Sequence, residues 1–473
     1  MQTRLNNISI AGKPIYSHIG FWIIFFFLLR MVGIINPPLE IGHNWRQITG
    51  LMVARNFLEI DPSIFFPRVD ETNGATGIIG MEFPSLNYLH YLFSKVFGYS
   101  HWYGRLINLI VSSIGVYFFY RIAKKYFTEK HALISAIFLL SSSWFLFSRK
   151  MMPDTFCISL MFIGVYYGIS YLEENRWKNA FISILFISLA MLSKIPAGIY
   201  LAIFIPVFYS LGRKKRHFIY LFLLVIPLLL TYSWYFIWNP YLATTYGNWY
   251  NIGRPLNEGF MEIISNPGAT LKNFYFNTFA GYVVTFFSLL GIFFMFKFKQ
   301  KALIYTFVLV FLLFLIYIFK SGYFFYHHSY YIIPFVPVMA LLAGYTISLL
   351  NKKSILIFLV AVGVIESIAN QQHDLFLKPS EKYKLELKDI AQTVSNPSDL
   401  IIINGNGNPQ QLYLSNRKGW VIYDDQLNTT HIDSLNDKGA KYLFINKHSQ
   451  FNDLPYEVVY EDSSYVVQNL DSE

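Results

Sequence analysis

Long apolar stretches recur along most of the chain and then stop. About eleven of them approach the roughly 20 mainly apolar residues that a helix needs to cross the hydrocarbon core of a bilayer. They lie near residues 17–36, 104–122, 131–148, 155–172, 179–193, 196–211, 217–237, 278–296, 302–319, 329–349 and 354–370. This pattern predicts a polytopic α-helical membrane domain over residues 1–372.

After residue 372 the pattern changes to short apolar segments separated by polar helical ones. The periodicity predicts buried strands, one helix and a terminal hairpin, at residues 400–404, 420–423 and 441–445, at 381–394, and at 456–470. These elements make a small α/β domain over residues 373–473. Gly405-Asn406-Gly407 lacks the third glycine of a dinucleotide-binding loop, so a plain turn from strand to helix is favoured there.

The short loops between the apolar stretches are basic. If the N-terminus is cytoplasmic, every strongly basic short loop falls on the cytoplasmic side, as the positive-inside rule requires. The first external loop then covers about residues 37–103, a second covers about 239–277, and the C-terminal domain lies outside the cytoplasm. Within the first loop, residues 44–58 and 86–96 have apolar positions at helical spacing but are too short to span, which predicts amphipathic helices in the membrane interface.

Composition supports this division and excludes several classes of protein. Hydrophobic residues make up 54% of the chain and charged residues only 14%, against roughly 25% charged in an average soluble protein. From Glu381 onward the chain holds 14 acidic and 8 basic residues, so the net charge of +10 comes from the membrane loops. No nucleic-acid partner is therefore expected. The single cysteine, Cys157, excludes intrachain disulfides and thiolate metal clusters.

Charged groups near a membrane are costly and usually face a protein interior or a water-filled cavity. In the predicted topology the informative ones gather at or near the external surface: Arg46, Asp70, Glu82, Arg105, Arg149, Lys150, Asp154, Lys194, Lys320, His327 and His328. Cations can stabilise a departing phosphate, and a carboxylate can accept the proton of an attacking hydroxyl. Such a set suits sugar transfer from a lipid phosphate.

Other interpretations of these residues stay open. Arg149 and Lys150 could snorkel from the end of a span, whereas Lys194 precedes Ile195-Pro196 at a break between two apolar stretches. Adjacent histidines point apart on a helix, which disfavours a zinc site at His327-His328. The aromatic residues 323–331 fit an interfacial belt or the lining of a sugar site.

Several short motifs follow one another along the chain: His43-Asn44-Trp45-Arg46-Gln47, Ala54-Arg55-Asn56-Phe57, Met81-Glu82-Phe83-Pro84, Gly104-Arg105, residues 149–154, Leu192-Ser193-Lys194, and His328 with Tyr330-Tyr331. In this order they resemble the GT-C membrane glycosyltransferases. The likeness is to the bacterial branch of the protein mannosyltransferase and aminoarabinose transferase-like superfamily, of the glycosyltransferase family 39 type with a Trp-Arg-Gln motif. The C-terminal segment looks like the small external domain that some members append.

The resemblance implies roles for particular residues. Members generally carry an acid at the start of the first external helix, where this chain has Arg46-Gln47, so the acid is expected from later in the loop. Glu82 is the first choice as base and Asp70 the second. Asp154 matches an acidic position that helps shape the sugar site. The residues expected to bind the carrier phosphate and sugar are Arg46, Arg105, Arg149, Lys150, Lys194, His328 and Tyr331.

The predicted activity is an inverting transfer of sugar from undecaprenyl phosphate-sugar, or a related polyprenyl donor, to a glycan, lipid or protein outside the cytoplasm. It places the chain in a bacterial cytoplasmic membrane, among membrane lipids. No cofactor besides the lipid-linked donor and no metal site is predicted, although a divalent metal requirement stays open. The rival prediction is a transporter or lipid flippase, but the two related halves typical of transporters are not evident. The donor sugar, the acceptor and the oligomeric state are not set by the sequence.

Overall fold

The computed structural model describes residues 9–10, 13–39, 42–211, 215–247, 253–449 and 454–471. The chain divides into two compact units, each built from three separate segments. The helical unit comprises Met1–Ile34, Arg105–Tyr235 and Asn251–His373, and the mixed unit comprises Ile35–Gly104, Phe236–Tyr250 and Asp374–Glu473. The predicted first external loop and the predicted C-terminal domain therefore pack into one unit.

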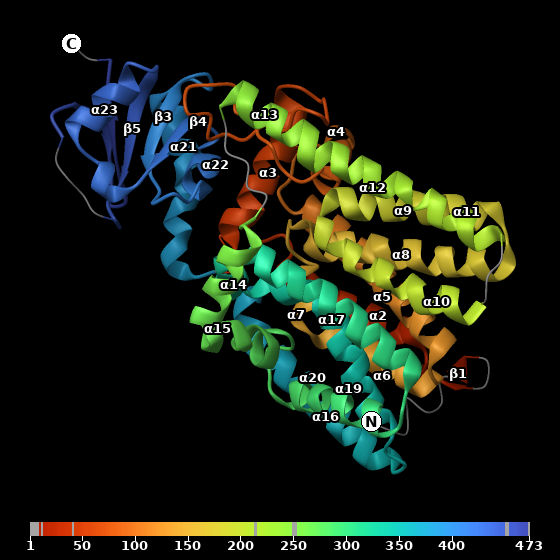
Figure 1. Ribbon diagram of the computed structural model, residues 1–473. Helices are drawn as coiled ribbons and strands as arrows, with labels where there is room; N and C mark the ends of the chain where they lie inside the picture. Colours follow the sequence, from red (N-terminus) through yellow and green to blue (C-terminus); the bar gives the residue numbers. More distant parts are fainter. Residues whose placement is uncertain are drawn as a thin grey trace. The chain divides into compact units, whose positions relative to one another are not determined.

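Each apolar stretch predicted from the sequence coincides with a helix or with successive helices of the helical unit (Figure 1). The elements are β1 (Ser9–Ile10), β2 (Lys13–Pro14), α2 (Ile19–Met31), α5 (Tyr103–Tyr126), α6 (Glu129–Ser141), α7 (Ser143–Phe147), α8 (Pro153–Glu174), α9 (Trp177–Ser193), η2 (Ile195–Ile203), α10 (Phe204–Leu211), α11 (Lys215–Leu223), α12 (Val225–Tyr232), α14 (Leu256–Ser265), α15 (Pro267–Lys272), η4 (Asn273–Asn277), α16 (Val283–Lys297), α17 (Lys301–Ser321), α18 (Tyr323–His327), η5 (Ser329–Phe335), α19 (Val336–Ser348) and α20 (Lys353–Gln371). The predicted polytopic helical architecture is confirmed.

Length and composition identify the helices that can cross a membrane. Among the described residues, six are long and apolar enough: Tyr103–Tyr126, Pro153–Glu174, Arg216–Tyr246, Lys301–Ser321, Ser329–Ser348 and Lys353–Val394. Four shorter apolar helices accompany them: Ile19–Met31, Trp177–Ser193, Ile195–Leu211 and Val283–Lys297. The total of about eleven spans stays a prediction.

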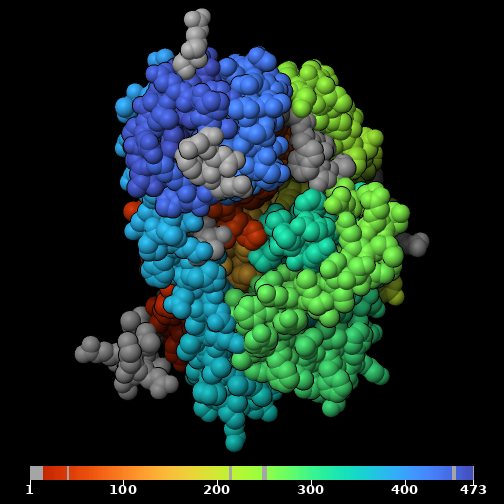
Figure 2. Space-filling model, turned by 90° about the vertical axis from the view of Figure 1, so that its left-hand side faces the viewer, coloured from red at the N-terminus to blue at the C-terminus, as the bar shows by residue number. Residues whose placement is uncertain are grey.

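Two of these helical segments are enclosed by the others. The most apolar parts of α8 and of η5 with α19 are 89% buried, whereas those of α17 and α20 are only 22% buried and expose apolar side chains. A helix that is hydrophobic on all sides is typically buried among other helices. Gly344 of α19 allows a close approach to α6, since a Cβ atom there would lie 2.1 Å from the Ser135 hydroxyl. On the face drawn in Figure 2, green residues of α14 and α15 lie beside teal residues of α17 and α18, against which they pack.

The chain breaks for local reasons within one predicted apolar stretch, 131–148, and between two others, 179–193 and 196–211. Between α6 and α7, Ser142 is extended (ψ 172°) and its hydroxyl accepts a hydrogen bond from the Trp144 amide, which ends one helix and starts the next. Between α9 and η2, Lys194 is extended (φ −166°, ψ 121°) and Pro196 follows in the first turn of η2. Proline is tolerated in the first turn of a helix, so a new helix starts directly after the extended Lys194.

The mixed unit contains three helices that precede the C-terminal domain: α3 (Asn44–Glu59), α4 (Ser85–Phe97) and α13 (Asn239–Tyr246). In α4 the buried face carries Asn87, His90 and Ser94, while apolar residues such as Leu92 and Val96 are exposed. An apolar face turned outward suits the predicted position in the membrane interface, which stays a prediction.

The C-terminal part of the mixed unit is a five-stranded sheet with helices. Its elements are η7 (Pro379–Glu386), α21 (Leu387–Val394), β3 (Leu400–Asn404), α22 (Gln410–Ser415), β4 (Lys418–Ile422), η8 (Asp424–Gln426), α23 (Thr429–Asn436), β5 (Ala440–Asn446), β6 (Glu457–Glu461) and β7 (Tyr465–Asn469). The strand order is β4-β3-β5-β7-β6; β3 is parallel to both of its neighbours, and β7 is antiparallel to β5 and β6. The predicted α/β domain, its three buried strands and its terminal hairpin are confirmed.

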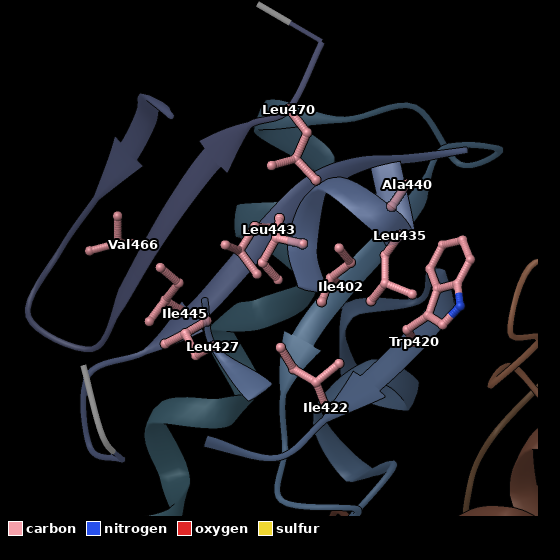
Figure 3. Close-up of a cluster of buried hydrophobic side chains, with 11 residues drawn as sticks. Ile402, Trp420, Ile422, Leu427, Leu435, Ala440, Leu443, Ile445, Val466 and Leu470 are labelled. Atoms are coloured by element: carbon pink, nitrogen blue, oxygen red, sulfur yellow. The ribbon is translucent and has the colours of Figure 1, made fainter. Parts of the chain in front are cut away.

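Apolar side chains from one face of this sheet and from α23 form its core (Figure 3). Ile402 at its centre is fully buried between Trp420 of β4 and Leu443 of β5, its Cα partners in the parallel ladders. Gly405-Asn406-Gly407 makes the predicted turn from strand β3 to helix α22. Gly407 adopts φ +74°, and a Cβ atom there would lie 2.6 Å from the Tyr423 hydroxyl, so this position favours glycine.

Candidate functional site

An ion pair between Asp154 and Lys194 lies in the helical unit. Asp154 is in the first turn of α8, directly after Pro153, where a carboxylate is favoured by the helix dipole. Lys194 stands at the break between α9 and η2, and its Nζ pairs with Oδ1 of Asp154. Asp154 is 3% exposed, and its second oxygen, Oδ2, accepts no hydrogen bond from the described residues.

Aromatic rings of η5 surround the lysine. Its Nζ lies 5.1 Å from the ring centroid of Tyr330 and 5.7 Å from that of Tyr331, both within cation–π range. The His328 ring stacks on Tyr330 at 5.4 Å, and Tyr331 stacks on Tyr317 at 5.8 Å. A cation, an unsatisfied carboxylate oxygen and aromatic faces thus meet at one place, a combination that suits a sugar attached to a phosphate.

Asn108 of α5 fixes the turn that leads to Asp154. Its amide Nδ2 donates to the carbonyls of Lys150 (2.9 Å) and Met152 (3.1 Å), and its Oδ1 accepts from the Thr155 hydroxyl (3.1 Å). Asn108 is fully buried. Asn108 is not among the site residues predicted above, although a polar residue inside a predicted span is a usable signal.

The two predicted arginines of the helical unit hold the end of α2. Arg149 donates from Nε to the Arg30 carbonyl (3.1 Å) and from Nη2 to the Val32 carbonyl (2.7 Å), and Arg105 donates to the Ile34 carbonyl (3.3 Å). Cations are favoured at a helix C-terminus. Both side chains are fully buried, so Arg149 does not snorkel to a surface.

Lys150 is also fully buried, and its Nζ lies 5.3 Å from the Phe147 ring centroid. It does not snorkel either. A role of Lys150, Arg105 or Arg149 at the carrier phosphate stays a prediction.

A second charged pair lies in the mixed unit, between Arg46 of α3 and Glu82, which precedes α4. The two side chains are 18% and 15% exposed. Asn239 of α13 donates to the carbonyl of Met81 (2.7 Å) and so fixes the backbone next to Glu82. Within the part of the chain that the structure describes, the Glu82 carboxylate pairs with one cation, Arg46, and it is partly open to its surroundings, as a proton acceptor needs to be.

Asp70 has a different environment. It is 1% exposed, and its carboxylate accepts from Arg55 (2.5 Å) and from the Asn56 amide (3.0 Å). Arg55 in turn donates to the Tyr413 carbonyl (3.1 Å) and lies 4.4 Å from the Tyr413 ring centroid. Both carboxylate oxygens are engaged with buried donors, so the geometry argues for a structural clamp and against Asp70 as the base.

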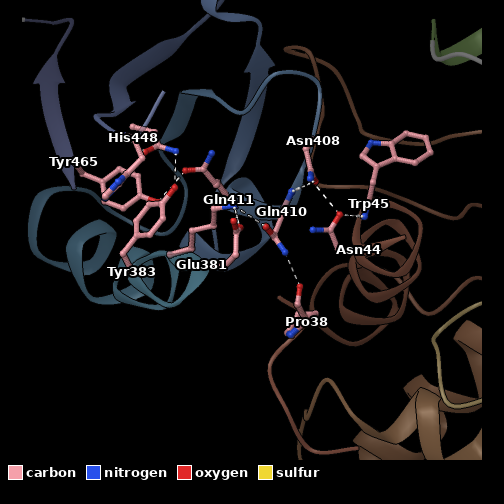
Figure 4. Close-up of polar contacts among 12 residues, drawn as sticks. Pro38, Asn44, Trp45, Glu381, Tyr383, Asn408, Gln410, Gln411, His448 and Tyr465 are labelled. Carbon is pink, nitrogen blue, oxygen red and sulfur yellow. Dashed lines mark hydrogen bonds and ion pairs between the residues drawn. The ribbon is translucent and has the colours of Figure 1, made fainter. Parts of the chain in front are cut away.

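Polar side chains of the C-terminal domain reach the beginning of α3 within the same unit (Figure 4). Gln410 donates from Nε2 to the Pro38 carbonyl (2.7 Å), and Asn408 donates to the Asn44 side chain (3.3 Å). Asn44 Oδ1 also accepts from the Trp45 amide (2.6 Å). These contacts position the segment that carries Arg46.

The predicted site residues therefore form two groups. In the helical unit the structure brings together Asp154, Lys194, His328 and Tyr331, and adds Tyr330 and Asn108. In the mixed unit it pairs Arg46 with Glu82 and sets Asp70 apart with Arg55. Within the described ranges, no group of three His, Cys, Asp or Glu side chains lies close enough to hold a metal ion, and metal dependence stays open.

Comparison with known proteins identifies the fold. A family model described as dolichyl-phosphate-mannose-protein mannosyltransferase matches residues 82–238, about a third of the chain. No curated protein sequence matches the chain.

Solved structures match over nearly the whole chain. ArnT from Cupriavidus metallidurans in the apo state matches with a TM-score of 0.61 and 13% identity, covering 95% of this chain and 97% of ArnT. The same protein bound to undecaprenyl phosphate gives 0.60 and 14%, with coverage of 95% and 98%. The oligosaccharyltransferase AglB from Archaeoglobus fulgidus, in complex with an inhibitory peptide and a dolichol-phosphate, gives 0.55 and 11%, with coverage of 90% and 69%. The predicted GT-C fold is confirmed.

Proposed function

Proceeding from the GT-C fold, we propose that the chain is a glycosyltransferase that moves a sugar from a polyprenyl phosphate to an acceptor outside the cytoplasm, in a bacterial cytoplasmic membrane. The family model for dolichyl-phosphate-mannose-protein mannosyltransferases and the structural neighbour bound to undecaprenyl phosphate support a lipid-phosphate donor. The acceptor is a glycan, a lipid or a protein.

The observation that carries the proposal is the Asp154–Lys194 pair among the rings of Tyr330, Tyr331 and His328. A buried carboxylate oxygen without a donor costs about 1–3 kcal/mol or more, so a protein keeps one where a ligand completes it. Lys194 donates to the donor phosphate, Oδ2 of Asp154 accepts from a sugar hydroxyl, and the rings cover the apolar face of the sugar.

The reaction is a single displacement. The acceptor hydroxyl oxygen attacks the anomeric carbon while the bond from that carbon to the phosphate oxygen breaks, and the bonding electrons leave with the polyprenyl phosphate. Glu82 takes the proton of the hydroxyl, and Lys194 stabilises the negative charge that grows on the phosphate. Attack opposite to the leaving group inverts the anomeric configuration. Each step uses side chains of this chain only.

Mass spectrometry of lipid carriers and envelope glycans in a deletion strain tests the proposal. Loss of the chain should raise one polyprenyl phosphate-sugar and remove the same sugar from one envelope component. Complementation with the wild-type gene should reverse both changes, whereas Glu82→Gln and Asp154→Asn should not. Asp61→Asn is the matched control, since Asp61 lies in the same loop as Glu82 but pairs with Arg68 (2.9 Å) and is 36% exposed.

Full complementation by both Glu82→Gln and Asp154→Asn contradicts the proposed roles. A different result would favour a transporter: purified protein in vesicles would move a labelled polyprenyl phosphate-sugar across the bilayer, and no sugar would reach any acceptor.

A further inference from the structure

A mostly apolar cavity of about 710 Å³ opens in the helical unit, between α5, α8, α10, α17 and α19. The mechanism above uses none of its lining residues. The cavity lies toward the end of the helices where the short loops are basic, since its lining includes Tyr126 at the end of α5, Ser210 near the end of α10 and Lys301 at the start of α17. The positive-inside rule places this end in the cytoplasm.

The cavity is open at this basic end. Tyr209 is 89% exposed and Tyr305 is 48% exposed, whereas Phe162 and Tyr200 in the interior part are only 2% exposed. Lining residues on α17 run from Lys301 to Leu309, which at the rise of an α-helix gives a depth of about 12 Å. An apolar chain can therefore enter from the surrounding lipid between α10 and α17.

Positively charged side chains lie near the opening of the cavity. The short turn between α16 and α17 brings Lys297, Lys299 and Lys301 within five residues of one another. Two other lysines at this end have acidic partners: Lys124 pairs with Glu129 and Lys125 pairs with Glu173. Lys301, by contrast, forms no ion pair within the described chain, and no acidic side chain is found among the described lining residues.

We propose that this cavity binds an anionic phospholipid of the inner leaflet, with one acyl chain inside it and the headgroup phosphate at Lys301. Basic pockets between transmembrane helices on the cytoplasmic side commonly hold such lipids. The proposal is independent of sugar transfer.

The polarity of the cavity favours this occupant over the isoprenoid chain of the carrier. A carrier whose phosphate is at Lys194 would extend its far, uncharged end toward the opening, where a lysine contributes nothing to its binding. A phospholipid would bind the other way round, with its charged headgroup at Lys301 and an apolar chain toward Phe162 and Tyr200. The cavity is charged at its opening and apolar inside, which matches the phospholipid.

Native mass spectrometry of the purified full-length protein tests the inference, with dioleoyl phosphatidylglycerol and dioleoyl phosphatidylcholine as probes. The wild type should retain phosphatidylglycerol in preference to phosphatidylcholine and melt at a higher temperature in its presence. Lys301→Gln should lower the preference about five-fold, the effect of one lysine near a membrane surface. Ala302→Trp, which fills the cavity from α17, should abolish retention.

Lys352→Gln is the control, since Lys352 lies in another short basic loop and does not line the cavity; it should behave as the wild type. Because Lys301 is exposed, Lys301→Gln is expected to fold. It therefore still tests the inference if Ala302→Trp fails to fold. Equal retention of both lipids by wild type and Lys301→Gln overturns the inference. So does displacement of phosphatidylglycerol by undecaprenyl phosphate in the wild type, which would assign the cavity to the carrier chain and leave the proposed transfer intact.

Discussion

Lys194 uses only one of the two carboxylate oxygens of Asp154. Its Nζ pairs with Oδ1, while Oδ2 is buried and accepts no hydrogen bond from the described residues. The lysine side chain is 19% exposed and the aspartate 3%. A ligand can therefore bind to Oδ2 of Asp154 and to Nζ of Lys194 while the two side chains stay paired, so that neither charge is left without a partner.

Variants of this pair separate catalysis from stability. Asp154→Asn and Lys194→Gln should each lower transfer by about 10²–10³-fold, since each removes a charged group from the reaction site. Each should also lower the free energy of unfolding by about 3–5 kcal/mol, because the partner charge stays buried. The double variant should regain much of the stability and none of the activity. Thermal unfolding and transfer assays on the folded fraction measure the two effects.

Lys125→Gln with Glu173→Gln is the control for this cycle. That pair also joins a lysine to a carboxylate, but its side chains are 24% and 37% exposed, and exposed pairs contribute about 0–1 kcal/mol. This double variant should leave both the transfer rate and the free energy of unfolding unchanged. Recovery of transfer in the double variant at Asp154 and Lys194 would show that the pair is only structural.

Glu82 and Asp70 should respond in opposite ways to loss of charge. Glu82→Gln should abolish transfer and change the melting temperature little, because the carboxylate is partly exposed and, among the described residues, pairs only with Arg46. Asp70→Asn should leave Arg55 buried without its counter-ion and lower the free energy of unfolding by about 3–5 kcal/mol, while the folded fraction keeps its rate. If Asp70→Asn loses transfer without losing stability, the base has been assigned to the wrong carboxylate.

The helices and strands could be predicted because their causes are local. The apolar residues on every side of α8 and the short continuous apolar run of β3 can be recognised from the sequence alone. The end of the bundle at which Asp154 and Lys194 lie followed from the basic loops, since loop charge orients successive spans. Asp154 and Lys194, 40 residues apart in the chain, contact each other, and their position at the external end stays a prediction.

The polar contacts between distant segments could not be predicted in this way. Arg55 and Tyr413 are 358 residues apart, and no periodicity indicates that they meet. Asn108 is a single polar residue in a predicted span, and only the packing of α5 against the turn before α8 reveals its hydrogen bonds with Lys150, Met152 and Thr155. Periodicity determines which faces are buried, but the pairing of buried polar groups depends on the tertiary arrangement.

Tyr330 should contribute to donor binding through its ring. Tyr330→Phe keeps the ring face near Lys194, whereas Tyr330→Leu removes a cation–π contact worth about 0.5–2 kcal/mol. We expect Tyr330→Leu to weaken binding of undecaprenyl phosphate about 2- to 30-fold, and Tyr330→Phe to bind within about two-fold of the wild type. Titration calorimetry in detergent measures both. Tyr323→Leu is the control, since Tyr323 belongs to the same aromatic run but stacks on His327; equal losses in all three variants contradict the assignment.

His90 should make the stability of the mixed unit depend on pH. Burial lowers the pKa of this histidine from its usual 6.5 to about 4, and its Nε2 contacts the Ser100 carbonyl at 2.9 Å. The ring also stacks on Tyr99 at 5.4 Å, with nearly parallel planes. In the folded chain His90 is therefore neutral over the range in which the unfolded chain takes up a proton.

The direction of the pH effect follows from this difference. Because the pKa of a base is lowered by folding, the contribution of neutral His90 is complete above pH 6.5 and is lost as the pH falls from 6.5 toward 4. At pH 5 the loss should be about 2 kcal/mol, from 1.4 kcal/mol for each pH unit. His90→Gln, which can still donate to the Ser100 carbonyl, should melt with a weaker dependence on pH between 7 and 5 than the wild type. His431→Gln, on α23, should follow the wild type. Parallel melting curves for wild type and His90→Gln across this range would mean that His90 does not titrate differently on folding.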